Sequence, residues 1–166
     1  MTRVSEISRR PLTEADLEFS FVVYASTRKE EMDLVSFWTD EQKQLFLEQQ
    51  FQAQHTYYQQ QYPEGEFLIL LEQDRPIGRL YLHSGDEEIR IIDIALLPEH
   101  CGRGIGTMLL QEILADGAAT GKKVSIHVMQ NNRALRLYER LGFQQAGEVG
   151  VYWFLQWSPE GGATAS

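Results

Sequence analysis

The stretch PEHCGRGIG, residues 98–106, has a glycine at 102, 104 and 106 and leads directly into the apolar segment TMLLQEIL. Backbone N–H groups at the start of a helix have no partner within the helix, and together with the positive end of the helix dipole they attract anions. Glycine has no Cβ atom, so a bulky phosphate can approach these N–H groups closely. The stretch therefore predicts a turn that opens a helix over about 105–119 and holds a pyrophosphate; a tight turn without a ligand is the plain alternative.

Strands are predicted on both sides of this turn. The run IRIIDIALL (89–97) before it is apolar on both faces, which is typical of a central strand. After the helix, which is expected to end at Gly121, KVSIHVM (123–129) predicts a second strand. The order of the predicted strands and helices along the chain indicates an α/β (α+β) fold in which helices pack on a mixed sheet. The other elements expected from periodicity and turn residues are helices within 11–28, 39–62 and 132–141, the first two capped by Thr13 and Thr39, and strands over 66–72, 77–83, 144–150 and 151–157.

Length and composition limit the class of protein. A chain of 166 residues has room for one domain, which is predicted over 1–157 and buries about 70% of the surface of the unfolded chain. The segment SPEGGATAS that follows predicts a disordered tail over 158–166. A single cysteine allows no internal disulfide, and four scattered histidines have no zinc-ligand spacing, so no metal is expected.

Charge and hydropathy limit the classes of partner that the protein is expected to bind. The net charge of −9 would repel a phosphate backbone, which argues against nucleic acid as a partner. No apolar run approaches the ~18 residues of a membrane span, and the N-terminus has no apolar core of the ~7–15 residues that a signal peptide needs. We therefore expect no membrane partner and a cytoplasmic location.

Two other phosphate-binding motifs do not fit the glycine turn. A dinucleotide fingerprint needs an acidic residue about 20 positions after its glycines, where this chain has Lys122 and Lys123. The phosphate loop of nucleotide hydrolases needs Lys and then Ser or Thr after its last glycine, whereas Gly106 is followed by Thr107 and Met108.

A second motif, NNRALRLYERLGF (131–143), follows the glycine turn after some 25 residues. It resembles the Asn-x-x-Ala-x-x-Leu-Tyr-x-x-x-Gly-Phe signature of the GNAT-superfamily N-acetyltransferases, and Gly104 and Gly106 match that superfamily's Arg/Gln-x-x-Gly-x-Gly/Ala acetyl-CoA loop. The resemblance covers about 88–157, whereas 1–65 fits only in its two-helix layout. It implies a GNAT-like, mostly antiparallel sheet of six to seven strands, with helices on both faces and a splayed central parallel strand pair. The residues that match the second motif are Asn131, Ala134, Leu137, Tyr138, Gly142 and Phe143.

The resemblance implies acetyl-CoA as co-substrate and transfer of its acetyl group, by direct attack, to a primary amine of a small molecule or peptide. The pantetheine arm and acetyl group are expected along the main chain of Ile94, Ala95 and Leu96. Asn131, beside Ala134, is expected either to contact the pantetheine arm or to cap its helix. The residues implied for the pyrophosphate are Gly102, Arg103, Gly104, Ile105, Gly106 and Thr107.

Tyr138 is implied to donate a proton to the departing thiolate. A phenol of pKa about 10 is a credible donor to a thiolate whose conjugate acid has a pKa of about 8.5. A tyrosine that only packs its ring on the helix is the alternative. Cys101 stands at the Arg/Gln position of the loop pattern and is expected to be a small filler beneath the turn rather than a nucleophile.

The proton acceptor is open between Glu88, Asp93 and His127. Many family members have a glutamate six residues before the position of Leu96, and here that residue is Arg90. Strict alternation along the strand places Glu88 on the face of Arg90 and Asp93 on the opposite face.

Arg90 at this position favours a different class of function, a non-catalytic acyl-CoA-binding sensor, while an intact Tyr138 argues against it. The acidic charge balance favours a cationic acceptor, and a homodimer remains open. Glu30 and Glu31, in the expected loop after the first helix, are interpreted as a solvated face that could also attract a cationic acceptor.

Overall fold

One sheet runs through residues 6–159, the part of the chain that this computed structural model describes. Its strands are β1 (Ile7–Pro11), β2 (Glu66–Glu72), β3 (Arg75–Ser84), β4 (Glu88–Leu96), β5 (Lys123–Met129), β6 (Gln144–Val149) and β7 (Tyr152–Trp157). They lie in the order β1-β2-β3-β4-β5-β7-β6, and all neighbours are antiparallel except the central pair β4 and β5. The predicted α/β (α+β) fold, with a mixed, mostly antiparallel sheet of six to seven strands, is confirmed.

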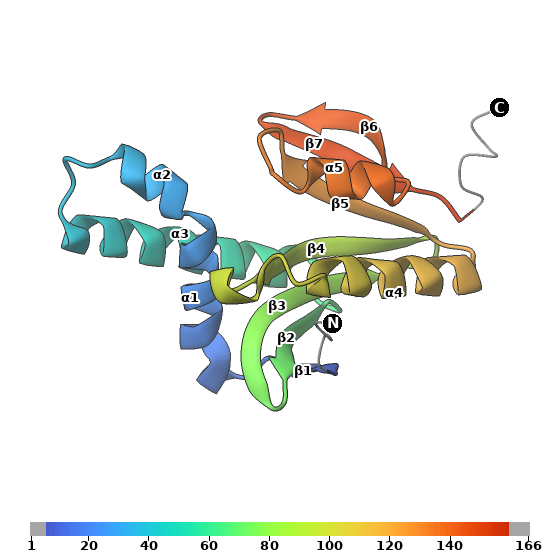
Figure 1. The fold of residues 1–166 in the computed structure, drawn as a ribbon, viewed down its shortest axis with the longest axis horizontal. Helices are drawn as coiled ribbons and strands as arrows, with labels where there is room; N and C mark the ends of the chain where they lie inside the picture. Colours follow the sequence, from blue (N-terminus) through green and yellow to red (C-terminus); the bar gives the residue numbers. More distant parts are fainter. Residues whose placement is uncertain (1–5, 160–166) are drawn as a thin grey trace.

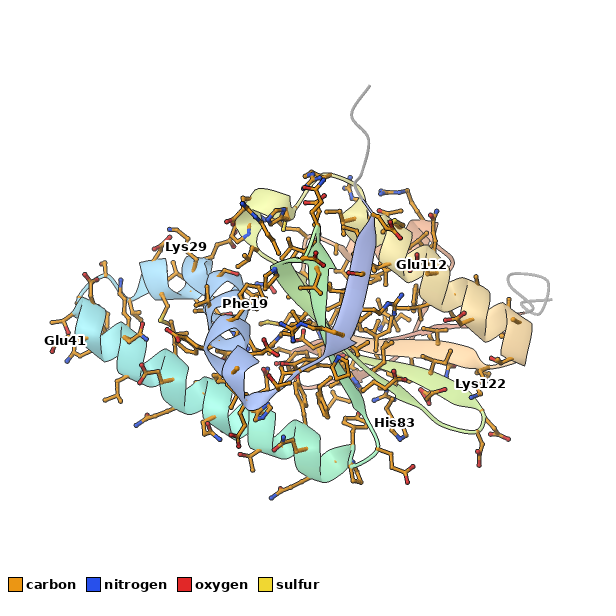
Figure 2. All side chains as sticks on the ribbon, turned by 90° about the horizontal axis from the view of Figure 1, so that it is seen from below. Phe19, Lys29, Glu41, His83, Glu112 and Lys122 are labelled. Carbon is orange, nitrogen blue, oxygen red and sulfur yellow. The ribbon has the colours of Figure 1, made fainter. Side chains whose placement is uncertain are left out.

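The helices in the described residues are α1 (Leu17–Thr27), α2 (Lys29–Leu34), α3 (Asp40–Gln61), α4 (Ile105–Thr120) and α5 (Leu135–Arg140), with short 3₁₀ turns at Glu14–Asp16 and Pro98–His100. α1 contacts β3, β4 and α3, and Figure 2 shows α1 and α3 together across the sheet from α4. α4 and α5 share the other face, because β4, β5 and β6 are parallel to one another and successive crossovers are right-handed. Helices therefore cover both faces, as expected (Figure 1).

The start of α3 and the end of α4 lie where the sequence predicts them. The Thr39 side chain accepts a hydrogen bond from the backbone N–H of Gln42 at 3.1 Å, and the Gln42 side chain accepts one from Thr39 N–H at 2.8 Å. α4 ends at Gly121, which has a φ of +70°. Such a φ is rarely adopted by other residues, so the glycine stops the helix there.

Two elements were not expected from the sequence. β1 is an edge strand that carries Arg9, Arg10 and Pro11 and depends on its pairing with β2, so its own residues show no strand pattern. α2 lies where a loop was expected around Glu30 and Glu31, and it buries no residue. Its support is local: Lys29 is paired with Asp33 across one turn, at 3.0 Å.

α5 begins at Leu135, later than the predicted start at 132. The Oδ1 atom of Asn132 accepts a hydrogen bond from the backbone N–H of Ala134 at 2.7 Å, which forms a side-chain turn before the helix. The N-cap of α5 is Ala134 and no side chain caps the helix, so the capping role considered for Asn131 is not observed.

β4 contains one residue more than the strand it pairs with. Tyr81 on β3 is opposite Asp93, whereas the next residue, Leu82, is opposite Ile91, so Ile92 has no partner on β3. A bulge of this kind bends the strand and interrupts the alternation of its side chains.

The prediction that Asp93 faces away from Arg90 is wrong because of this bulge. Arg90 Nη1 donates a hydrogen bond to the hydroxyl of Tyr62, at the end of α3, over 3.2 Å. Asp93 forms an ion pair with Arg79, whose Nη2 also donates to Gln54 Oε1 on α3. Both side chains therefore lie on the face of the sheet that α3 covers.

The parallel pair β4 and β5 separates close to the bulge. The last pair of the parallel ladder is Ile91 opposite Ile126. Beyond it, β4 continues along β3 and β5 continues along β7, so the two strands diverge (Figure 1). The backbone groups of residues 92–96 that point away from β3 thus have no strand partner among the described residues. The expected splay of the central pair is confirmed.

Gly78 tests how tightly β3 and β4 are packed at the end of this segment. A Cβ atom at Gly78 would lie 2.3 Å from the carbonyl oxygen of Ala95 and 3.0 Å from Leu96 Cα, both of them backbone atoms. We expect Gly78→Ala to lower the free energy of unfolding by about 1–3 kcal/mol or more in urea denaturation, because the backbone must move. Gly85→Ala is the matched control, since its Cβ would meet nothing closer than 3.4 Å. Equal effects of the two substitutions would contradict this account.

Candidate active site

The glycine turn before α4 has the backbone that only glycine adopts easily. Gly102 and Gly104 have φ angles of +78° and +83°, and Gly104 is the N-cap of α4. The first helical hydrogen bond of α4 runs from Met108 N–H to Gly104 O at 3.0 Å. The N–H groups of Ile105, Gly106 and Thr107 precede that bond and have no intrahelical partner.

Gly106 has no conformational reason to be glycine. It lies within the first turn of α4, and a Cβ atom there would meet nothing within 4 Å; the same is true of Gly102 and Gly104. The surface over the turn is therefore open, and glycine inside a helix is less favourable than alanine by roughly 0.5–1 kcal/mol. A ligand that needs the space above the first N–H groups of α4 explains this residue, and a pyrophosphate fits such a cradle.

Arg103 and Cys101 turn towards the protein. The Arg103 guanidinium binds both carboxylate oxygens of Glu72 at the end of β2, at 2.9 and 2.7 Å, and its Nη1 lies 3.1 Å from His100 Nδ1. The Arg103 side chain therefore anchors the turn to β2, and the expected place of this residue at the pyrophosphate stays a prediction. Cys101 is exposed, with Sγ 3.7 and 3.6 Å from the carbonyl oxygens of Leu96 and Leu97.

Tyr138 on α5 is 4% exposed, and its ring packs edge-on against Phe143 with centroids 5.6 Å apart. Burial raises the pKa of Tyr138 above its ordinary value, and the negative charge of Asp93 raises that pKa further. The phenol therefore keeps its proton at neutral pH. Two other residues of the same motif precede Tyr138. Asn131 is exposed and has no side-chain hydrogen bond within residues 6–159, and Ala134 packs against the core.

Glu88 lies where β4 and β5 are still paired. Its Oε1 accepts hydrogen bonds from Ser125 Oγ and from Arg90 Nη2, the latter at 3.2 Å. Arg90 Nε also donates to Ser125 Oγ at 2.7 Å. Arg90, at the position of the expected glutamate, therefore closes a polar cluster with Glu88.

His127 lies one residue beyond the end of the parallel ladder. Its Nδ1 is 3.5 Å from Arg90 Nη1, and its ring packs on Phe154 with centroids 5.0 Å apart. Burial and the charge of Arg90 lower the pKa of His127, so the imidazole is neutral at pH 7 and able to accept a proton.

Asp93 is held from inside the protein by Arg79. Arg79 and Tyr58, a second tyrosine whose pKa is raised by burial and by the charge of Asp93, were not singled out from the sequence. The sequence does hold a sign of the role of Arg79, because this arginine lies inside the apolar run IGRLYLH. A charge in the middle of a buried strand needs a partner.

A surface pocket of about 570 Å³ lies beside Arg90, at the hairpin between β3 and β4. His83 lines it and packs on Tyr62 with ring centroids 5.4 Å apart; Figure 2 shows His83 near the end of α3. Within residues 6–159, no group of three or more His, Cys, Asp or Glu side chains is arranged to hold a metal ion. In the same residues, no helix has the length and apolar character needed to cross a membrane.

The model of the acetyltransferase (GNAT) family matches residues 32–143, so the chain belongs to this family. The predicted membership of the GNAT acetyltransferase family is therefore confirmed.

The individual proteins to which this chain is similar share 30% or less of the aligned residues with it. The [ribosomal protein bS18]-alanine N-acetyltransferase of Haemophilus influenzae is 30% identical over 79 residues, which are 47% of this chain and 54% of that protein. The chain thus spans about half the length of this curated relative.

Two solved structures share the fold. The PaiA N-acetyltransferase of Thermoplasma acidophilum, in complex with coenzyme A, superposes with a TM-score of 0.67 at 19% identity, over 92% of this chain and 99% of that one. The ribosomal-protein-S18-alanine N-acetyltransferase of Escherichia coli superposes with a TM-score of 0.61 at 16% identity, over 92% and 94%.

Gly106→Ala separates folding from ligand binding. We expect the alanine to raise the free energy of unfolding by about 0.4–1 kcal/mol, because it fits the helix and the space is open. Coenzyme A should bind about tenfold or more weakly, since blocking one charge-assisted N–H contact costs roughly 1.5–3 kcal/mol. Calorimetric titration measures the affinity for coenzyme A, and pantetheine, which has no pyrophosphate, is the control ligand. Equal losses for both ligands would argue against the pyrophosphate cradle.

Proposed function

We propose that the protein transfers the acetyl group of acetyl-CoA to a primary amine of a small molecule or peptide by direct attack. The observation that carries this proposal is the separation of β4 from β5 after Ile91, with the glycine turn at the far end of β4 and Tyr138 beside the separated strands. Unpaired backbone groups in such a place call for a partner. An extended pantetheine arm supplies it.

The binding residues follow from this arrangement. The free main-chain groups of Ile94, Ala95 and Leu96 would bind the pantetheine arm and orient the acetyl group. The pyrophosphate would rest on the N–H groups of residues 102–107, and Asn131 would be free to contact the arm. When bound, acetyl-CoA supplies an activated thioester carbonyl.

The proton balance requires both an acid and a base. An alkylammonium with a pKa of about 10.4 is neutral only about 0.04% of the time at pH 7, so one proton must first be accepted from it. The amine then forms the C–N bond as the C–S bond breaks, Tyr138 donates its proton to the departing sulfur, and the second nitrogen proton restores Tyr138. One proton goes to solvent through the base.

The three candidate bases differ in their contacts and in their positions along the separated strands. Glu88 already accepts hydrogen bonds from Arg90 and Ser125 where the two strands are still paired. His127 and Asp93 lie beyond the last pair, and only Asp93 affects the pKa of Tyr138. Asp93 and His127 are therefore better placed than Glu88.

For the acceptor, the charge of −9 supports a cationic amine, and the name of the Haemophilus influenzae relative adds a peptide N-terminus to the candidates. The proposed domain is 1–157, and the proposed setting is the cytoplasm. A non-catalytic acyl-CoA sensor is supported by one observation: Arg90 stands where the glutamate was expected and is held by Glu88.

Thiol release from acetyl-CoA, measured with polyamines, amino acids, aminoglycosides and N-terminal peptides, tests the function. We expect turnover with at least one class and an acetylated acceptor by mass spectrometry. Tight binding of coenzyme A without turnover on any acceptor would favour the sensor.

Tyr138→Phe tests the acid. We expect kcat to fall by roughly 10²-fold, because the departing sulfur loses its proton donor, while the Kd of coenzyme A stays within a few-fold. Steady-state kinetics and calorimetric titration measure the two quantities, and Tyr57→Phe, a change on the exposed side of α3, is the control. An unchanged kcat would reduce Tyr138 to a packing residue.

A further inference from the structure

Arg79 is a charged residue in the interior of the protein. It lies in the middle of β3 and is 2% exposed. Its Nη1 donates to Ser20 Oγ on α1 and its Nη2 to Gln54 Oε1 on α3, each over 3.1 Å, and it forms an ion pair with Asp93 on β4. Three elements besides its own strand therefore hold one guanidinium.

Aromatic rings complete its surroundings. The guanidinium carbon lies 4.9 Å from the ring centre of Tyr81, 5.8 Å from that of Tyr24 and 6.0 Å from that of Phe51. The Ser20 hydroxyl is in turn 2.6 Å from the hydroxyl of Tyr81. These contacts leave the guanidinium one orientation.

Stability alone does not explain such a residue. Taking an ion pair out of water offsets most or all of the attraction between its charges, and apolar side chains of similar volume serve a core at least as well. The pair is thus better explained by what it does to Asp93, the partly exposed member.

Asp93 stands at the point where the proposed reaction would occur. It follows the bulge residue Ile92 and precedes Ile94, on the segment of β4 that has left β5. Its Oδ2 faces Arg79 and is sealed from solvent, while the side chain as a whole is 23% exposed. One carboxylate oxygen is therefore held inside the protein, while the side chain as a whole keeps some exposed surface.

Two tyrosines from opposite faces of the sheet lie within the field of this carboxylate. Tyr58 belongs to α3, and Tyr138 belongs to α5. The charge of Asp93 raises the pKa of both phenols, which lie on the two sides of the separated strands. Asp93 thus lies on the face that α1 and α3 cover, and the proposed acid lies on the other side of the separated strands.

We propose that Asp93 is the group that accepts the proton of the acceptor amine, and that Arg79 is a positioning residue that fixes the Asp93 carboxylate for this step. The proposal rests on the proposed acetyl transfer. The ammonium gives one proton to the carboxylate, which passes it to water. The nitrogen then forms the C–N bond as the C–S bond breaks, the sulfur leaves with the proton of Tyr138, and the second nitrogen proton restores Tyr138. Arginine suits the positioning role because its planar guanidinium offers several donors in a rigid arrangement and stays protonated.

The experiment is a double-mutant cycle of Arg79→Met and Asp93→Asn in the full chain. Asp93→Asn should lower kcat by roughly 10²-fold or more. Arg79→Met should lower kcat by about tenfold to 10²-fold, since a displaced catalytic group loses rate steeply, with the KM for acetyl-CoA unchanged. Combining Arg79→Met with Asp93→Asn should lower kcat no further, and Arg79→Lys should restore part of the loss.

Thermal unfolding without any ligand is the second readout. Asp93→Asn should lower the Tm most, because it leaves the charge of Arg79 buried and unpaired, and Arg79→Met in the same chain should recover part of that loss. Arg10→Met is the matched control: Arg10 lies on the edge strand β1 and binds both oxygens of Asp16 at 2.7 and 2.9 Å, so the kcat of this variant should not change.

Three results would overturn the proposal: additive losses of kcat, a KM for acetyl-CoA that rises with the loss, or full activity in folded Asp93→Asn. If Arg79→Met does not fold, Gln54→Leu, which removes one support of the guanidinium, replaces it in the same cycle and must lower kcat only when Asp93 is present. Absence of turnover in the unmodified protein would refute the proposed function instead, so the two failures are distinguishable.

Discussion

The rest of the site depends on the point where β4 stops pairing with β5. A parallel ladder that ends at Ile91 while both strands continue leaves a row of backbone groups with no strand partner within residues 6–159. Most proteins do not tolerate this in a central position, because unpaired backbone groups out of contact with water are costly. The fold thereby creates a place that an extended, polar ligand completes. The bulge at Ile92 allows it, because it lets β4 bend away while it stays paired with β3.

The charges around these strands are balanced locally. Arg103 is bound to Glu72 beneath the glycine turn, and Arg79 is bound to Asp93 at the bulge. The cradle over α4 consequently presents backbone N–H groups, whose positions do not depend on a mobile side chain. Charged residues near the site orient their neighbours, and the open surface at Gly106 is left for the ligand. This arrangement of charges suits the proposed site, which would bind and release a large anionic molecule at each turnover.

Prediction from the sequence succeeded where the information was local. Alternating glycines before an apolar helix specify a turn with positive φ, and Thr39 and Gly121 marked helix ends by hydrogen bonding and backbone freedom. Tyr138 was singled out as a candidate because the motif around it is contiguous. β1 and α2 were missed, since one is an edge strand that depends on its neighbour and the other buries nothing.

The sequence by itself determined the family, the central strands and the glycine turn, because each is encoded by residues within one turn or strand of one another. Only the tertiary structure decided which face Asp93 occupies, since a single unpaired residue on β4 reverses the alternation and depends on the register with β3. The tertiary structure also decided the partners of Arg79, which come from α1, α3 and β4. Ion pairs between distant segments depend on how those segments pack, and no local pattern in the chain records that packing.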